Sequence, residues 1–150
     1  MEKLVNKLKE KGLTISSCES LTGGLFASRL VGISGASSVF VGSYVTYMDR
    51  CKEVLLNGKE ILDTVGAISE KMAILMAKEV KTKLQSDIGV SFTGNAGPLA
   101  SEGKEVGLVY SCIYIKDDYY VYKDVFSGDR NSIRNQVIDI TIKRIFEKIN

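Results

Sequence analysis

The sequence predicts an α/β fold, a three-layer α/β/α sandwich built on a mostly parallel, mixed sheet. Two observations support this class. Through the first two thirds of the chain, helical segments alternate with short apolar strands, as in parallel crossover units. The last third has two β-rich segments joined by residues 116–118, which predicts an antiparallel hairpin, and then a closing helix. Because 150 residues suffice for one core, we expect a single domain over residues 1–150.

In the first half of the chain, side-chain spacing and stop signals define the elements. Leu4, Val5 and Leu8 recur at helical spacing before Gly12, a natural helix stop. β-Branched and aromatic residues predict a strand over residues 39–47. The expected order is helix 2–11, strand 13–17, helix 25–31, loop 32–38, strand 39–47, helix 49–56 with Asp49 as its cap, and helix 59–65.

In the second half, Ser69 has the composition of an N-cap for a longer helix that ends near Gln85. A short apolar strand over residues 88–93 runs into a glycine-rich turn. The remaining expected elements are strands 106–115 and 119–126 and a last helix from about 129 to 147.

Composition narrows the function classes. A formal net charge of +2 gives no reason to expect nucleic-acid binding, and we interpret the lysines near both ends of the chain, including Lys11 and Lys148, as solvated helix faces. No segment is apolar and long enough for a membrane span, and the N-terminus lacks a signal-peptide pattern. Three cysteines without CxxC spacing, and no histidine, predict free thiols in a cytoplasmic protein with no metal and no cofactor.

Three polar or glycine-rich segments follow predicted strands. The first is Ser20-Leu-Thr-Gly-Gly24, the second contains Tyr47 with Lys52 shortly after it, and the third is Thr93-Gly-Asn-Ala-Gly97. In open α/β sheets, ligands bind beyond the carboxyl ends of the strands, so these segments should meet at one site. The amides at the Gly23-Gly24 helix start could face an anion or an oxyanion.

Because the chain has no histidine, a serine nucleophile would need another base. A lysine with a lowered pKa can activate Ser20, and a tyrosine can relay or orient the proton, which points to amide hydrolysis or acyl transfer by Ser20, Lys52 and Tyr47. Each residue also has a structural interpretation. The serine turn can be a helix cap, Lys52 a solvated side chain, and Tyr47 an aromatic that packs under a loop.

Taken in order, these motifs resemble the carboxyl-terminal domain family of the competence/damage-inducible protein CinA. The resemblance covers nearly the whole chain, with Tyr47 and Lys52 in register. It rests on residues 19–24 (ESLTGG), 42–52, 66–69, 93–98 (TGNAGP), 106–107 and 126–134. No residues correspond to the pyrophosphatase domain that precedes this domain in full-length CinA proteins, so a stand-alone form without that activity is expected.

The resemblance implies metal-independent hydrolysis of nicotinamide mononucleotide to nicotinate mononucleotide and ammonia, a step of pyridine-nucleotide salvage, by a homo-oligomer. It makes Ser20 the nucleophile and Lys52 its base, assisted by Tyr47. The residues implied to bind the small-molecule nucleotide substrate are Thr22, Gly23, Gly24, Thr93, Gly94, Asn95, Ala96 and Gly97.

The chain departs from the family pattern near the expected site. The usual serine and asparagine after the tyrosine are Met48 and Asp49, and the usual isoleucine of the glycine-rich turn is Asn95. These differences bear on how the substrate fits. They motivate a second hypothesis, a non-catalytic nucleotide-binding or competence- and DNA-damage-associated interaction module.

Overall fold

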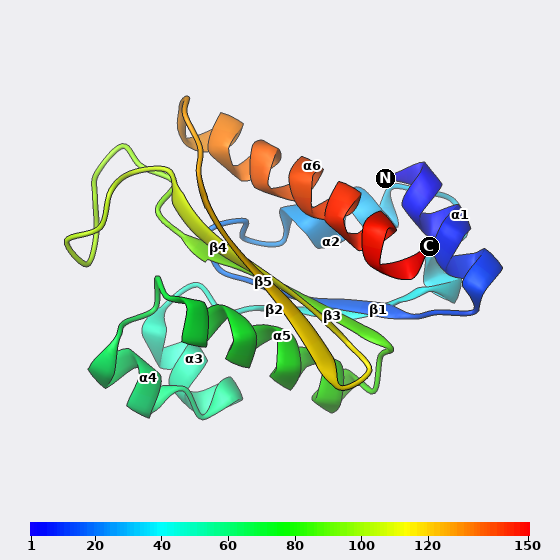
Figure 1. Ribbon diagram of the computed structural model, residues 1–150, viewed down its shortest axis with the longest axis horizontal. Coiled ribbons are helices and arrows are strands. Elements are labelled where there is room, and N and C mark those ends of the chain that lie inside the picture. The colour runs from blue at the N-terminus through cyan, green and yellow to red at the C-terminus, as the bar shows by residue number, and fades with distance from the viewer.

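Helices cover both faces of a five-stranded sheet in the computed structural model, which describes residues 1–150 (Figure 1). The strand order is β2-β1-β3-β4-β5. The strand β1 (Ile15–Glu19) is parallel to its neighbours β2 (Phe40–Val45) and β3 (Ile88–Gly94), whereas β4 (Leu108–Ile115) and β5 (Asp118–Val125) add two antiparallel pairings. The predicted α/β class with a mixed sheet is confirmed.

The helices form the two outer layers of the sandwich (Figure 1). One face of the sheet is covered by α1 (Glu2–Lys11), α2 (Leu25–Val31) and α6 (Arg130–Ile149), with a short 3-10 helix at Ala36–Ser38. The other face is covered by α3 (Asp49–Leu56), α4 (Lys59–Thr64) and α5 (Glu70–Leu84). None of these helices combines the length and the apolar character needed to cross a membrane.

Each face of the sheet has its own hydrophobic core. The larger core contains 21 buried residues, among them Leu8, Phe26 and Ile145 from the three helices of the first face. The smaller cores lie under α5 and contain Met76 and Ala77. The sheet is therefore shared by both layers, and its central strands β1 and β3 are almost wholly buried.

The strand β1 covers residues 15–19 rather than the predicted 13–17. Because both of its ends lie two residues later, Ser20 follows it directly. Thr14 is held outside the strand because its amide and hydroxyl both donate to Asp87 Oδ2, at 2.7 and 2.8 Å. Pairing with strands on both sides then keeps polar residues of β1, including Glu19, in extended and buried backbone. Tertiary pairing, rather than local propensity, sets this boundary.

The cap predicted at Ser69 is confirmed, the cap predicted at Asp49 is wrong, and the structure adds a cap at Asp129. Ser69 and Asp129 accept hydrogen bonds from the amides of Met72 and Ser132, as expected for N-caps. Asp49 was expected to cap α3, but it is the first helical residue, and the N-cap position is held by Met48 without a side-chain bond. The Asp49 carboxylate instead faces Lys52, one turn along the helix.

Candidate functional site

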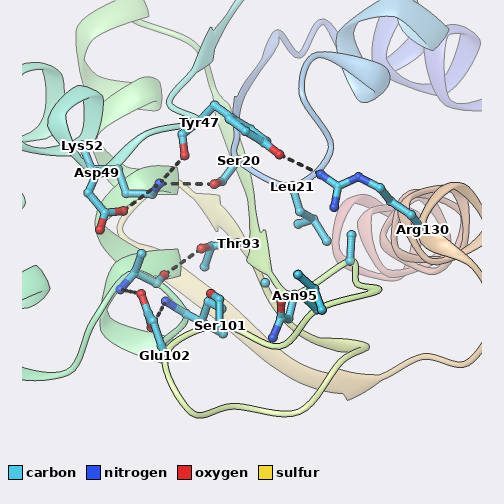
Figure 2. Close-up of a pocket in the computed structure, with 15 residues that line it drawn as sticks. Ser20, Leu21, Tyr47, Asp49, Lys52, Thr93, Asn95, Ser101, Glu102 and Arg130 are labelled. Carbon is cyan, nitrogen blue, oxygen red and sulfur yellow. Dashed lines mark hydrogen bonds and ion pairs between the residues drawn. The ribbon is translucent and has the colours of Figure 1, made fainter.

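A cavity of about 390 Å³ lies beyond the carboxyl ends of β1, β2 and β3 (Figure 2). Its lining brings together side chains that are far apart in the sequence. Of the residues predicted from the sequence, those that line it are Ser20, Tyr47, Lys52, Thr93, Gly94, Asn95 and Ala96.

The side chain of Lys52 is almost completely buried, with 1% of its surface exposed. Its Nζ donates to Ser20 Oγ at 3.2 Å and to the carbonyl oxygens of Thr46 and Tyr47 at 2.8 and 3.3 Å. Burial lowers the pKa of Lys52 because the charged ammonium is desolvated, and the Asp49 carboxylate, 3.7 Å away, partly opposes this effect. The site therefore joins a serine hydroxyl to an amine that loses its proton more readily than an ordinary lysine.

The turn after Ser20 is filled by groups of the protein itself. The buried carboxylate of Glu19 accepts from the amides of Gly24, Phe26 and Ala27 at 3.0, 3.1 and 2.9 Å, and so occupies the N-terminus of α2. The Gly23 amide donates to the carbonyl oxygen of Ser20 at 3.0 Å. The sequence-based expectation that the Gly23 and Gly24 amides face a ligand is thus corrected, because both amides are already bonded inside the turn.

Thr22 also lies outside the cavity lining. Its side chain is fully buried, and its hydroxyl has no hydrogen-bond partner. Arg134, from α6, donates to the carbonyl oxygens of Leu21 and Thr22 at 3.0 and 2.8 Å. The turn is therefore braced at its amides by Glu19 and at its carbonyls by Arg134, which fixes the place of the Ser20 hydroxyl.

Tyr47 points its hydroxyl toward Arg130 rather than toward the serine and the lysine (Figure 2). Arg130 Nη2 donates to the Tyr47 hydroxyl at 2.7 Å, and Nη1 donates to the carbonyl oxygen of Gly97 at 2.7 Å. Lys52 contacts Tyr47 only through its backbone carbonyl. Gly97 does not line the cavity, and its carbonyl serves to hold Arg130.

The carboxyl end of β3 forms the opposite wall of the cavity. The Thr93 hydroxyl donates to the carbonyl oxygen of Ala67 at 2.7 Å, and the Asn95 side-chain amide donates to the carbonyl oxygen of Lys104 at 2.9 Å. Glu102 accepts from the amide of Ala67 at 2.8 Å. These bonds tie the segment after β3 to the residues that lead into α5.

Two other kinds of reactive group are relevant at this site, a thiol nucleophile and a cluster of metal-ligating side chains. Burial raises the pKa of the Cys18 thiol to about 12, so the sulfur next to Thr46 stays protonated and is a weak nucleophile. No group of three or more histidine, cysteine, aspartate or glutamate side chains is placed to hold a metal ion. Ser20 is the hydroxyl of the lining that has an amine, that of Lys52, as its hydrogen-bond partner.

Arg130 and Glu102 line the cavity although the sequence does not reveal them as site residues, and Asp49, noted above for its departure from the family pattern, lies there too. Arg130 is the first residue of α6, and its distance along the chain from Tyr47 hides their contact. One signal was present in the sequence: Arg130 follows Asp129, a helix N-cap residue, and the start of a helix often lies at the ligand edge of an α/β sheet.

Comparisons with known proteins agree with this architecture. The family model described as the CinA C-terminal domain matches residues 1–149. A protein of Oceanobacillus iheyensis, provisionally named competence-damage inducible protein, is 45% identical over 135 residues, 89% of this chain and 32% of its own length. A protein of the same provisional name from Bacillus cytotoxicus is 43% identical over 149 residues, 98% of this chain and 36% of its own length. The chain thus spans about a third of these curated relatives.

Solved structures share the fold over nearly their full length. A CinA superfamily protein from Klebsiella pneumoniae superposes with a TM-score of 0.96 at 25% identity and covers 99% of this chain and 94% of its own. The competence/damage inducible protein CihA from Agrobacterium tumefaciens has a TM-score of 0.92 at 30% identity, with 97% and 90% covered. The chain therefore belongs to the CinA C-terminal domain family.

Proposed function

We propose that this domain hydrolyses the carboxamide of nicotinamide mononucleotide to nicotinate mononucleotide and ammonia, with Ser20 as nucleophile and Lys52 as base. The observation that carries the proposal is the buried Lys52 amine, 3.2 Å from Ser20 Oγ at the wall of the cavity. A desolvated amine beside a serine hydroxyl is one way in which a protein without histidine activates an oxygen nucleophile.

In the first step, neutral Lys52 takes the proton of Ser20 as Oγ attacks the carboxamide carbon. Negative charge then develops on the carboxamide oxygen. The Leu21 amide directly follows the nucleophile, and Leu21 lines the cavity. This amide donates none of the hydrogen bonds of the turn, so it is free to stabilise that oxygen.

In the second step, the carbon–nitrogen bond breaks and Lys52 returns its proton to the departing ammonia, which leaves an ester on Ser20. Water then attacks the ester carbon while Lys52 accepts a proton from it. Breaking the bond to Oγ releases nicotinate mononucleotide and restores the Ser20 hydroxyl. One water is consumed and one ammonia is formed.

Charged and polar groups of the lining support recognition of a nucleotide. The Arg130 guanidinium is held by Tyr47 and Gly97 at the cavity, where it can pair with a phosphate. The carbonyl oxygen of the Asn95 side chain accepts no hydrogen bond from the protein, while its amide is held by Lys104. We assign Thr22, Gly23 and Gly24 to positioning Ser20 rather than to contact with the substrate.

The proposal is tested by measuring ammonia released from nicotinamide mononucleotide by the purified protein with a chelator present. Ser20→Ala and Lys52→Met should each lower kcat by at least about a hundredfold, because nucleophile or proton acceptor is lost. Lys71→Met, which removes an exposed lysine of α5, is the matched control and should leave kcat unchanged.

Turnover that survives in Ser20→Ala would remove the mechanism. Loss of turnover with chelator alone, restored by added metal, would contradict the metal-independent reaction.

A nucleotide-binding module without catalysis is the second candidate. The observation in its favour is Asp49, whose carboxylate lies 3.7 Å from Lys52 Nζ and favours the charged form of the amine. Saturable binding of nicotinamide mononucleotide without ammonia release, equally strong in Ser20→Ala, would support it. The provisional names of the relatives link it to competence and damage induction.

The proposal also places the protein in the cytoplasm as a homo-oligomer that acts on a small-molecule nucleotide. Both statements rest on the family resemblance and on free cysteines, of which Cys18 and Cys112 are buried. They stay predictions.

A further inference from the structure

A second cavity, of about 410 Å³, lies at the end of the sheet opposite to Ser20. It is bounded by the carboxyl-terminal ends of α1, α5 and α6 and by the turn between β4 and β5, which gather at one end of the molecule (Figure 1). Four lysines from these four elements line it, namely Lys11, Lys81, Lys116 and Lys148. Segments interpreted from the sequence as separate solvated faces are thus brought to one concave site.

None of these four lysines has a carboxylate partner. The seven ion pairs of the protein all involve other residues. The one acidic side chain of the cavity, Asp87, is already engaged, since its Oδ2 accepts from both the amide and the hydroxyl of Thr14. The lining therefore carries four lysines against one carboxylate, whose pKa is lowered by the Thr14 hydrogen bonds and by the charge of Lys81, and a net positive charge remains.

Two of the lysines lie over tyrosine rings. Lys148 Nζ lies 3.9 Å from the ring centre of Tyr120, and Lys81 Nζ lies 6.0 Å from that of Tyr114. Such contacts attract an ammonium group to the ring face without neutralising its charge. The positive charge of the cavity therefore remains available to a ligand.

Lys116 occupies a turn position that disfavours a side chain. Its φ is 56°, in the left-handed region where glycine, asparagine and aspartate are preferred. A lysine at this position of the β4–β5 turn costs folding energy that glycine would not. The cost is understandable if the ammonium group of Lys116 contributes to binding.

We propose that this cavity binds a small oligophosphate of the nucleoside di- or triphosphate class. Lysine ammonium groups are point-charge partners for phosphate, and several phosphates match several unpaired lysines. Leu13, Ile115 and Ile149 provide an apolar wall for a nucleoside, and the volume suits a ligand of this size. The site is concave and local, which favours a small polyanion over a nucleic-acid duplex.

The test is isothermal titration of the full chain with two probes, inorganic tripolyphosphate and ATP. Both should bind, more weakly when salt is raised from about 50 to about 200 mM, because the contacts are ionic. Tighter binding of ATP would assign a contact to the nucleoside. Equal affinity would assign recognition to the phosphate chain, which also fits the proposal.

Two variants with matched controls locate the site. Lys81→Gln and Lys148→Gln should each weaken tripolyphosphate about tenfold, the effect of one charge-assisted contact. Lys78→Gln on α5 and Lys143→Gln on α6 make the same charge change outside the cavity, and both should bind as the parent protein does.

Lys116→Gly separates binding from folding. It should weaken tripolyphosphate while the melting temperature stays the same or rises, because glycine accepts a φ of 56° without strain. If Lys116 had no part in binding, Lys116→Gly would bind tripolyphosphate as tightly as the parent protein does, and this outcome would contradict its assigned role.

Three results would overturn the proposal. The first is no binding of either probe to the parent protein. The second is binding that Lys81→Gln and Lys148→Gln leave unchanged, or that Arg130→Gln abolishes, which would put the anion in the Ser20 cavity. The third is a DNA duplex that binds more tightly than both probes and is lost in the same variants.

Discussion

At the scale of single residues, the main feature is a lysine buried where its charge is disfavoured. Lys52 is held by three oxygens, but its amine is shielded from water, and its pKa is lowered by that burial. The folded protein thus holds a proton on Lys52 less tightly than the unfolded chain does. The proposed catalysis by the neutral amine and a cost to the stability of the fold therefore have the same origin.

The pH dependence of turnover and stability follows from the sign of this shift. kcat/KM should rise with pH through the lowered pKa of Lys52 and level off above it, since the neutral amine is the active form in the proposed mechanism. The free energy of unfolding should rise with pH between the lowered pKa of Lys52 and the ordinary lysine value, because the unfolded chain binds more protons in that window. Below the lowered pKa, the full penalty of burying the charged amine applies.

Replacing the buried amine separates these two effects. At neutral pH, Lys52→Met should abolish turnover and raise the melting temperature by about 2–4 °C for each kcal/mol of relieved burial penalty. The gain should shrink as pH approaches the ordinary lysine value. Melting curves of both proteins across pH check this, and a gain that grows with pH would contradict the assigned sign.

At the scale of elements, the sequence predicts most helices because their signals are local. Leu4, Val5 and Leu8 before Gly12, the cap at Ser69 and the helical pattern from about residue 129 predict elements that the structure contains. The limits of β1 are less well predicted because they depend on pairing with β2 and β3, which lie far along the chain.

In the candidate site too, features that follow from local sequence or strand order are predicted, whereas contacts between distant side chains are not. Ser20, Lys52 and Thr93 lie at strand ends or one helical turn beyond, so topology alone suggests that they meet. By contrast, the contact of Tyr47 with Arg130 depends on side-chain directions. The occupation of the α2 amides by Glu19 is equally hidden, because a glutamate at the end of a strand has no local signature of a helix cap.

The packing of α5 on β3 depends on a glycine. A Cβ on Gly89 would lie 2.2 Å from the carbonyl oxygen of Ala77 and 2.7 Å from Lys81 Cβ. Gly89→Ala should therefore destabilise the protein by about 1–3 kcal/mol, measured by urea unfolding. Gly32→Ala is the control, since its φ is −65° and its nearest contact is 3.5 Å, and it should be neutral or slightly stabilising. Equal effects of the two changes would refute the close packing.

At the scale of the whole molecule, one sheet serves two cores. The larger core joins α1, α2 and α6 to one face, and the smaller cores join α5 to the other, so neither layer keeps its buried surface without the sheet. This shared layer is a physical reason to expect that residues 1–150 behave as one domain.

Unfolding should therefore occur in one cooperative transition. Far-ultraviolet circular dichroism follows the helices, and near-ultraviolet circular dichroism follows the tyrosines, of which the chain has seven. The two signals should give the same midpoint in a urea titration. Two separated midpoints would mean that the layers unfold independently.

The surroundings of Lys52 Nζ also determine the direction of its lone pair. The carbonyl oxygens of Thr46 and Tyr47 can only accept, so after one proton is lost they retain the two remaining N–H groups. The lone pair is then left facing Ser20 Oγ, the one of its three hydrogen-bond partners that carries a hydrogen. The two main-chain oxygens thus orient the proposed base before any substrate arrives.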